Sequence, residues 1–277
     1  MDQPRIMVTR GVLPIPRVRH VRIHPTQRRN MRQDERDSRP PVSVAGPQIA
    51  VVIPALNEER SIGRVLQAIP RQFAELIVVV DNGSSDSTAS LALANGAQVL
   101  SEPHKGYGAA CLAGIAALPE EVEIVVFLDA DFSDYPEEME KLVAPILQNQ
   151  ADFVVGSRMV YPAARAALAP QQRWGNWLAT SLIRILFGYR YSDLGPFRAI
   201  RRDALESLRM SDRGYGWTVE MQIKAIKGGL HILEVPVQYR QRLGQSKISG
   251  TLKGTMRAGS KILYTVFRSA ADEWRKA

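Results

Sequence analysis

Two aspartates separated by one residue stand directly after an apolar run of the sequence. Asp129 and Asp131 follow residues 124–128, and in an extended strand side chains two positions apart point the same way. Mg²⁺ and Mn²⁺ prefer oxygen ligands and are commonly held by carboxylates together with substrate phosphates. An isolated Asp-x-Asp would indicate only a turn, but in this position the pair predicts a divalent-metal site for a phosphorylated ligand.

Small, polar and charged residues also follow the other apolar runs. They occupy Pro54 to Glu59, Asp81 to Asp86, His104 to Gly108 and Gly156 to Arg158. In a parallel sheet the carboxyl ends of the strands meet at one edge, and ligands bind just beyond that edge. We therefore expect these segments to gather around the two aspartates and to add at least two cations, Lys105 and Arg158.

The elements that must position these residues alternate between strands and helices. Strands are predicted over 49–54, 75–80, 98–101, 123–128 and 152–156, and helices over 59–69, 85–95, 106–118 and 136–148. The strands are nearly all apolar, which is typical of a sheet covered on both faces. The pattern predicts an α/β fold, with a doubly wound, mostly parallel sheet and helices on both faces.

The first 47 residues differ from the rest of the chain. They carry ten arginines, no lysine, four acidic residues and seven of the 17 prolines, and so hold much of the net charge of +8. No sustained apolar pattern runs through them, so we predict a disordered extension, 1–47, before a catalytic domain, 48–277. A plain linker, a start codon placed too far upstream and a polybasic arm remain open. No nucleic-acid partner is expected, because residues 48–277 are almost balanced in charge.

The amino-acid composition indicates the class of protein and its location in the cell. The chain of 277 residues is 45% hydrophobic and 23% charged, as globular proteins are. Its single cysteine, Cys111, excludes an internal disulfide and a metal site built from several cysteines. No apolar run reaches the roughly 18 residues of a membrane-spanning helix, and no signal peptide is expected. We therefore predict a cytoplasmic protein.

Two stretches have apolar residues at helical spacing with basic residues beside them. They are residues 174–186 and an amphipathic helix at about 251–270. Such helices lie in a lipid interface or pack against a sheet, and both possibilities remain open. The first possibility is the functional one, and it would give the protein peripheral contact with the inner face of the membrane. Nothing in the sequence indicates an oligomeric state.

The order of these motifs resembles glycosyltransferase family 2, which has the Rossmann-like GT-A fold. The later segments Asp193 to Ala199, Gly216 to Met221 and Gly244 to Lys247 are similar to its polyprenyl-phosphate branch, the dolichol-phosphate mannosyltransferase-like enzymes. Two departures stand out. Asn82 replaces a carboxylate that the family often has after Asp81, and Gly195-Pro196 replaces the usual Ser-Gly in the presumed acceptor region.

The resemblance implies an inverting, metal-dependent transferase that moves a hexose from a UDP- or GDP-sugar to a polyprenyl phosphate. It implies that Asp129 and Asp131 hold Mg²⁺ or Mn²⁺. The residues that it implies for nucleotide-sugar binding are Pro54, Ala55, Asn57, Glu58, Asp81, Lys105 and Asp129. Those implied for phosphate and acceptor binding are Arg158, Arg198, Arg240 and Lys247. The catalytic candidates are Asp131, Arg198, Asp193 and Glu220.

The acceptor decides whether a base is needed. A polyprenyl phosphate oxygen is already anionic, so cations that place it suffice, whereas a hydroxyl must be deprotonated during attack. None of the four histidines stands in an obvious place for that role, so Asp193 and Glu220 are the candidate bases for a hydroxyl. Two alternatives therefore remain, a family 2 enzyme with a soluble hydroxyl acceptor and a catalytically silent nucleotide-binding module.

Overall fold

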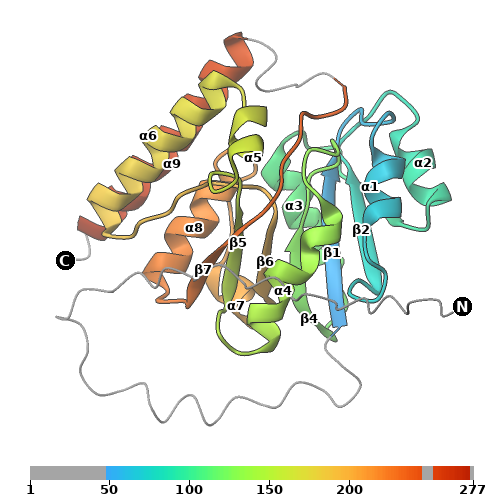
Figure 1. Ribbon diagram of the computed structural model, residues 1–277, viewed down its shortest axis with the longest axis horizontal. Coiled ribbons are helices and arrows are strands. Elements are labelled where there is room, and N and C mark those ends of the chain that lie inside the picture. The colour runs from blue at the N-terminus through green and yellow to red at the C-terminus, as the bar shows by residue number, and fades with distance from the viewer. Residues whose placement is uncertain (1–47, 245–251, 275–277) are drawn as a thin grey trace, which may run out of the picture. The chain divides into compact units, whose positions relative to one another are not determined.

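The computed structural model describes residues 48–244 and 252–274 (Figure 1). The predictions made for residues 1–47 and for Lys247 lie outside the described residues. Side chains of α9 are described only for residues 259–271.

Seven strands form one sheet in the order β3-β2-β1-β4-β6-β5-β7. Their bounds are β1 Gln48–Ala55, β2 Leu76–Asp81, β3 Gln98–Ser101, β4 Val122–Phe127, β5 Phe153–Ser157, β6 Arg198–Arg201 and β7 Ile232–Pro236. β6 is antiparallel to β4 and β5, and the other pairings are parallel. The predicted doubly wound, mostly parallel sheet is confirmed, and the reversed β6 inside it is an addition.

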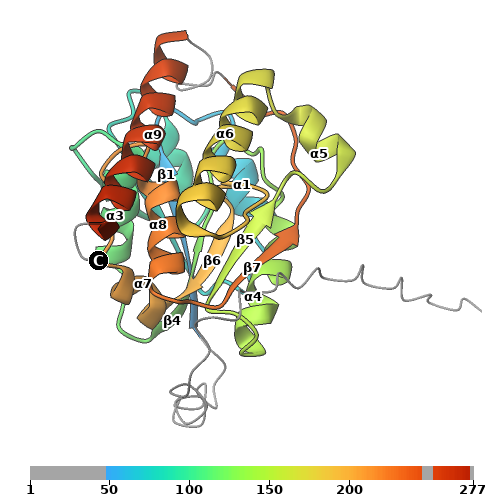
Figure 2. The same ribbon diagram turned by 90° about the vertical axis from the view of Figure 1, so that its left-hand side faces the viewer.

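Helices cover both faces of this sheet. They are α1 Ile62–Ala68, α2 Thr88–Ala94, α3 Tyr107–Ala116, η2 Pro136–Glu138, α4 Met139–Leu147, α5 Pro162–Ala167, α6 Pro170–Phe187, α7 Arg202–Leu208, α8 Trp217–Lys227 and α9 Leu252–Trp274. Figure 2 shows α3, α8 and α9 on one side of the sheet and α4 on the other. No helix in the described parts of the chain is both long enough and apolar enough to cross a bilayer.

The alternation of side chains along the strands produces two cores. In β1, Val51 and Ile53 pack in the cluster that includes α1 and α4, whereas Ala50 and Val52 face α3 and α8. Gly114 explains why α3 consists of small residues. A Cβ atom there would come within 2.5 Å of Val52 Cγ1, so the helix lies against β1 at a distance that only glycine allows.

The strand directions bring the described motifs that follow the strands to one edge of the sheet. β1, β2, β4, β5 and β7 all end at this edge, and the reversed β6 begins there, with Arg198 paired to Phe127 of β4 and Val155 of β5. Arg198 therefore reaches the same edge from the opposite direction. The loops at this edge follow β1, β2, β3, β4, β5 and β7.

One premise of the sequence interpretation is wrong. β4 ends at Phe127, and Ala130 and Asp131 lie in a turn, so no extended strand aligns Asp129 with Asp131. The helices also start later than predicted. Residues 59–61 form a turn before α1, and residues 85–87 are bends before α2.

Candidate active site

The loops after β1 and β2 are joined by hydrogen bonds. Asn57, with a positive φ of 51°, donates its N–H to Ser84 Oγ (2.8 Å), and its Oδ1 accepts the N–H of Ser85 (2.7 Å). The N–H of Glu58 donates to Thr88 Oγ1 (2.7 Å). The ends of β1 and β2 and these two loops hold five of the seven residues predicted to bind the nucleotide, all except Lys105 and Asp129. Among the five, Ala55 is buried and Pro54 and Asp81 are half-buried.

The hydrogen bonds of Asn82 explain why an amide suits the position where the family often has a carboxylate. Its amide nitrogen donates to the carbonyls of Glu102 and His104 (both 2.9 Å), and its oxygen accepts the N–H of Gly106 (2.7 Å). An ionised aspartate could accept the last bond but could not donate the first two. Asn82 therefore orders the segment that carries the exposed Lys105 beside the β2 loop.

The two aspartates predicted to bind metal lie next to each other in the turn after β4. The hydroxyl of Tyr107 donates to Asp129 Oδ1 (3.0 Å), and the N–H of Ser133 donates to Asp131 Oδ1 (2.9 Å). Burial, followed by the charge of Asp131, raises the pKa of Asp129 to about 7. The two carboxylates therefore repel one another across a short distance.

This pair suits a divalent cation that is shared with a ligand. Nowhere in the described residues do three or more His, Cys, Asp or Glu side chains form a cluster that could hold a metal ion alone. Mg²⁺ and Mn²⁺ accept one or two carboxylates and complete their shell with water and substrate phosphates. A cation would also relieve the repulsion that raises the pKa of Asp129, so the donor set fits.

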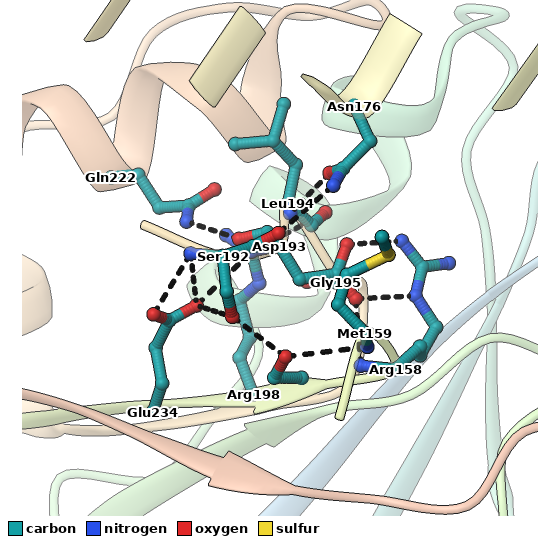
Figure 3. A network of polar contacts seen from close by, with 11 residues as sticks. Arg158, Met159, Asn176, Ser192, Asp193, Leu194, Gly195, Arg198, Gln222 and Glu234 are labelled. Carbon is teal, nitrogen blue, oxygen red and sulfur yellow. Dashed lines mark hydrogen bonds and ion pairs between the residues drawn. The ribbon is translucent and has the colours of Figure 1, made fainter. Parts of the chain in front are cut away.

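On the β5 side, Arg158 and Asp193 form a two-point ion pair (Figure 3). Arg158 Nε donates to Asp193 Oδ2 and Nη2 to Oδ1, both at 2.8 Å, and the backbone N–H of Arg158 also donates to Oδ2 (2.8 Å). Asp193 is fully buried. In this arrangement Asp193 fixes Arg158 at the end of β5.

Surrounding groups hold the loop that contains Asp193. Glu234 of β7 accepts the N–H groups of Ser192 (2.9 Å) and Asp193 (3.1 Å), and Gln222 of α8 donates to the carbonyl of Asp193 (3.0 Å). Asn176 of α6 accepts the N–H of Leu194 (2.9 Å). Figure 3 shows these side chains converging on the loop from β7, α8 and α6.

Arg198 lies beneath this loop and is fully buried. Its guanidinium donates to the carbonyls of Thr218 (3.0 Å), Leu194 (3.4 Å) and Gly195. Gly195 itself is packed against the β5 backbone, because a Cβ atom there would come within 2.4 Å of the Gly156 carbonyl. The structure thus shows Arg198 supporting the loop that carries Asp193, and its predicted phosphate contact stays a prediction.

Glu220, the other candidate base, is also engaged. It accepts the hydroxyl of Ser211 and the N–H of Asp212 (both 2.8 Å) and pairs with Lys224 (2.8 Å). These bonds hold a segment whose carbonyls accept the N–H groups at the start of α3, including Arg213 O from Ala109 (2.9 Å).

The segment after β7 supplies two further arginines. Arg240 donates to the carbonyls of Phe132 (2.6 Å) and Asp134 (3.0 Å), and its guanidinium lies 3.4 Å from the centre of the Phe132 ring. Arg242 donates to Glu58 (2.6 Å) and lies 3.3 Å from Asp131 Oδ2. Arg240 thus holds the aspartate loop, while Arg242 enters the site itself.

A cavity of about 410 Å³ opens beside Asp131 and Arg242. Its other walls are Tyr239 and the segment that joins α5 to the start of α6, residues 166–170 and Gln172. The cavity therefore extends from the carboxylate pair toward α6.

Three site residues were not predicted from the sequence: Arg242, Tyr107 and Asn82 as an organising group. Tyr107 stands in the Lys-Gly-Tyr-Gly motif, and Arg242 stands two residues after Arg240, so both had a signal in the pattern. Which arginine of that pair faces the carboxylates depends on how the segment folds back over the β4 loop.

Comparison with known proteins decides the family. Residues 50–209 match the family model described as glycosyl transferase family 2. The chain belongs to glycosyltransferase family 2.

Among relatives, an uncharacterised glycosyltransferase of Mycobacterium tuberculosis is 39% identical over 214 residues, covering 77% of this chain and 95% of the relative. The undecaprenyl-phosphate mannosyltransferase of Micrococcus luteus is 31% identical over 223 residues, covering 75% and 90%. The predicted resemblance to the family and to its polyprenyl-phosphate branch is confirmed, and the protein is a transferase enzyme.

Solved structures of similar glycosyltransferases confirm the GT-A fold. Glucosyl-3-phosphoglycerate synthase of Mycobacterium tuberculosis, in complex with Mn²⁺, UDP-glucose and phosphoglyceric acid, superposes with a TM-score of 0.66 at 26% identity. The match covers 82% of this glycosyltransferase and 81% of that chain. Divalent metal use by this neighbour agrees with the carboxylate pair described above.

Proposed function

We propose that this glycosyltransferase moves a hexose from a UDP- or GDP-sugar to a polyprenyl phosphate, with inversion and with Mg²⁺ or Mn²⁺. The observation that carries the proposal is the course of the cavity from Asp131 and Arg242 to the start of α6. An acceptor phosphate fits its charged end. The exposed apolar face of α6 then offers a path for a lipid chain.

The donor would lie over the joined loops after β1 and β2. Pro54, Ala55, Asn57, Glu58 and Asp81 line this side, and Lys105 approaches it on the segment that Asn82 holds. A cation bound to Asp129 and Asp131 would neutralise the charge of the departing nucleoside diphosphate. The protein's own contribution is to hold the sugar carbon against the acceptor oxygen.

The acceptor would need positioning more than deprotonation. Asp193 and Glu220 are engaged by Arg158 and Lys224, and an anionic phosphate oxygen requires no base. We assign Arg158 to the acceptor phosphate and Arg242 to the donor phosphates, since charge-assisted hydrogen bonds from guanidinium groups to phosphate are strong. In this proposal Arg198 and Arg240 position the surrounding loops, and Lys247 is a further cation of the acceptor side.

We propose that α6 and α9 bring the enzyme to the inner face of the membrane. The two helices are in contact, and they expose Trp174, Trp177, Ile185, Tyr264 and Phe267, with Trp174 63% and Ile185 76% accessible. Residues 159–192 contain four arginines and no acidic residue, so this face complements an anionic bilayer.

The test compares transfer to different acceptors, and then compares the binding of protein variants to vesicles. We expect transfer to polyprenyl phosphate in liposomes containing anionic lipid, and at least ten-fold less transfer to small hydroxylated acceptors. Replacing Trp174 and Trp177 by alanine should abolish vesicle binding, whereas Leu93→Ala, an exposed residue of α2, serves as the matched control. Equal vesicle binding by both variants would contradict the membrane role.

A soluble phosphorylated hydroxyl acceptor is the second candidate, because the structural neighbour was solved with phosphoglyceric acid. Its signature would be efficient transfer to such a compound without liposomes. It would also show a pH profile with an essential base that disappears in Asp193→Asn or Glu220→Gln.

A further inference from the structure

Arg242 forms ion pairs with both Glu58 and Asp131. The proposed function assigns Glu58 to the nucleotide and Asp131 to the metal. The Nη2 of Arg242 donates to Glu58 Oε1 (2.6 Å), on the nucleotide side. Its Nη1 lies 3.3 Å from Asp131 Oδ2, on the metal side. The Arg242 side chain is 25% exposed, so the guanidinium is in partial contact with solvent.

Backbone hydrogen bonds fix Arg242 in this place. The N–H of Leu243 donates to the carbonyl of Asp131 (3.0 Å), and the N–H of Arg240 donates to the carbonyl of Ser133 (2.9 Å). The residues on both sides of Arg242 are therefore attached to the loop of the metal aspartate. The ion pairs are a built feature of the site and not the chance contact of a long surface side chain.

The oxygens of Asp131 are already engaged. Oδ1 accepts the N–H and the hydroxyl of Ser133, and Oδ2 faces Arg242. A cation that binds Oδ2 must take it from the guanidinium or lie within about 5 Å of it, where like charges repel strongly in a partly buried site. The Nε of Arg242 is buried without a hydrogen-bond partner among the described residues, so this position leaves one donor unused.

We propose that Arg242 is a resident counter-ion of the metal site, which competes with the divalent cation for Asp131 and is transferred to the donor phosphates when cation and nucleotide enter together. The inference rests on the proposed metal role of Asp131. The diphosphate offers the displaced guanidinium a new two-point partner. Cation and nucleotide therefore bind with positive coupling, although the cation alone binds weakly.

The experiment measures binding and not turnover. Mn²⁺ titrations followed by electron paramagnetic resonance, with and without UDP or GDP, compare the wild type with Arg242→Gln. Arg184→Gln, an exposed arginine of α6, is the matched control. Without nucleotide, Arg242→Gln should bind Mn²⁺ about ten-fold more tightly, because the competing charge is gone. With nucleotide its advantage should disappear, and nucleotide affinity should fall about ten-fold.

These opposite changes distinguish the counter-ion role from loss of structure, which would weaken both affinities together. Equal Mn²⁺ affinity of wild type and Arg242→Gln without nucleotide would overturn the competition while leaving the metal site intact. Absence of Mn²⁺ binding in every variant would overturn the metal role of Asp131 and the counter-ion role with it. Tighter Mn²⁺ binding by Arg242→Gln alone supports the inference.

Discussion

At the scale of single residues, the partner of each charged group shows what it does in this structure. Asp129 is raised in pKa by burial and by the charge of Asp131, and Asp131 meets Arg242 only at 3.3 Å, whereas Asp193 is held by Arg158 and Glu220 by Lys224, each at 2.8 Å. Carboxylates that lack a full counter-charge in a cleft are candidates for ligand binding, and fully paired ones more often hold loops. The four acids of the site thus separate into two kinds.

Replacing Asp131, the proposed metal ligand, should remove catalysis without unfolding the protein. Asp131 lies in a turn after β4, so Asp131→Ala removes a ligand and no core packing. We expect transfer to fall at least a thousand-fold, in line with about 4 kcal/mol of lost transition-state stabilisation. Turnover, with the melting temperature as control, checks this. Full activity of the variant, or of the wild type in excess chelator, would exclude the metal role.

The pKa of Asp129 predicts a pH dependence of metal binding. This pKa is raised to about 7, so below pH 7 the carboxyl holds a proton that must leave before a cation can bind. The affinity for Mn²⁺ should therefore rise up to ten-fold per pH unit below pH 7 and level off above it. Titrations at pH 5.5, 6.5 and 8 measure this, and Asp129→Asn should remove the dependence. A flat profile in the wild type would contradict it.

At the scale of elements, loops at the carboxyl edge are held by side chains of neighbouring segments. Asn82 holds the segment before α3, Arg198 supports the loop before β6, and Arg240 binds the β7 segment to the β4 loop. Buried amide and guanidinium donors satisfy carbonyls that would otherwise be left unpaired. These bonds hold the loops at the edge where we propose that the substrates bind.

Changing Asn82 to the aspartate common in the family should harm this protein. Asn82→Asp keeps the size of the side chain but loses two donated bonds, and it turns a carboxylate toward two carbonyls. We expect a loss of about 1–3 kcal/mol in the free energy of unfolding and weaker nucleotide binding. Denaturant unfolding and nucleotide titration measure the two effects. Leu93→Ala, at an exposed position of α2, is a control that leaves these bonds in place. Equal stability of Asn82→Asp and wild type would refute the assigned role.

At the scale of the whole molecule, the body from 48 onward contains both cores and every described site residue. The sequence of residues 1–47 has no core-forming pattern, so their deletion should leave the melting temperature and donor affinity nearly unchanged. Calorimetry and nucleotide titration of the shortened chain check this. A large loss of stability would show that the segment docks on the body. Loss of binding to anionic vesicles alone would instead assign it a polybasic role.

The sequence by itself determined the fold class and which loops meet at the carboxyl edge of the sheet. Apolar runs such as 124–128 can be buried only in a covered sheet, and parallel strands carry their following loops to one edge. Local order along the chain was therefore enough to group Asp81, Asp129 and Arg158. The order of the motifs along the chain was also enough to identify the family.

Only the tertiary structure decided which charged side chains pair with one another. The ion pair of Arg158 with Asp193 and the contact of Arg242 with Glu58 join residues that are 35 and 184 positions apart. The reversal of β6, which brings Arg198 beneath the loop that carries Asp193, depends on pairing with β4 and β5. Periodicity reports only how a segment presents its own faces, whereas these contacts arise from the packing of separate segments. For that reason the partners of the arginines, and the presence of Arg242 at the site, could be read only from the folded chain.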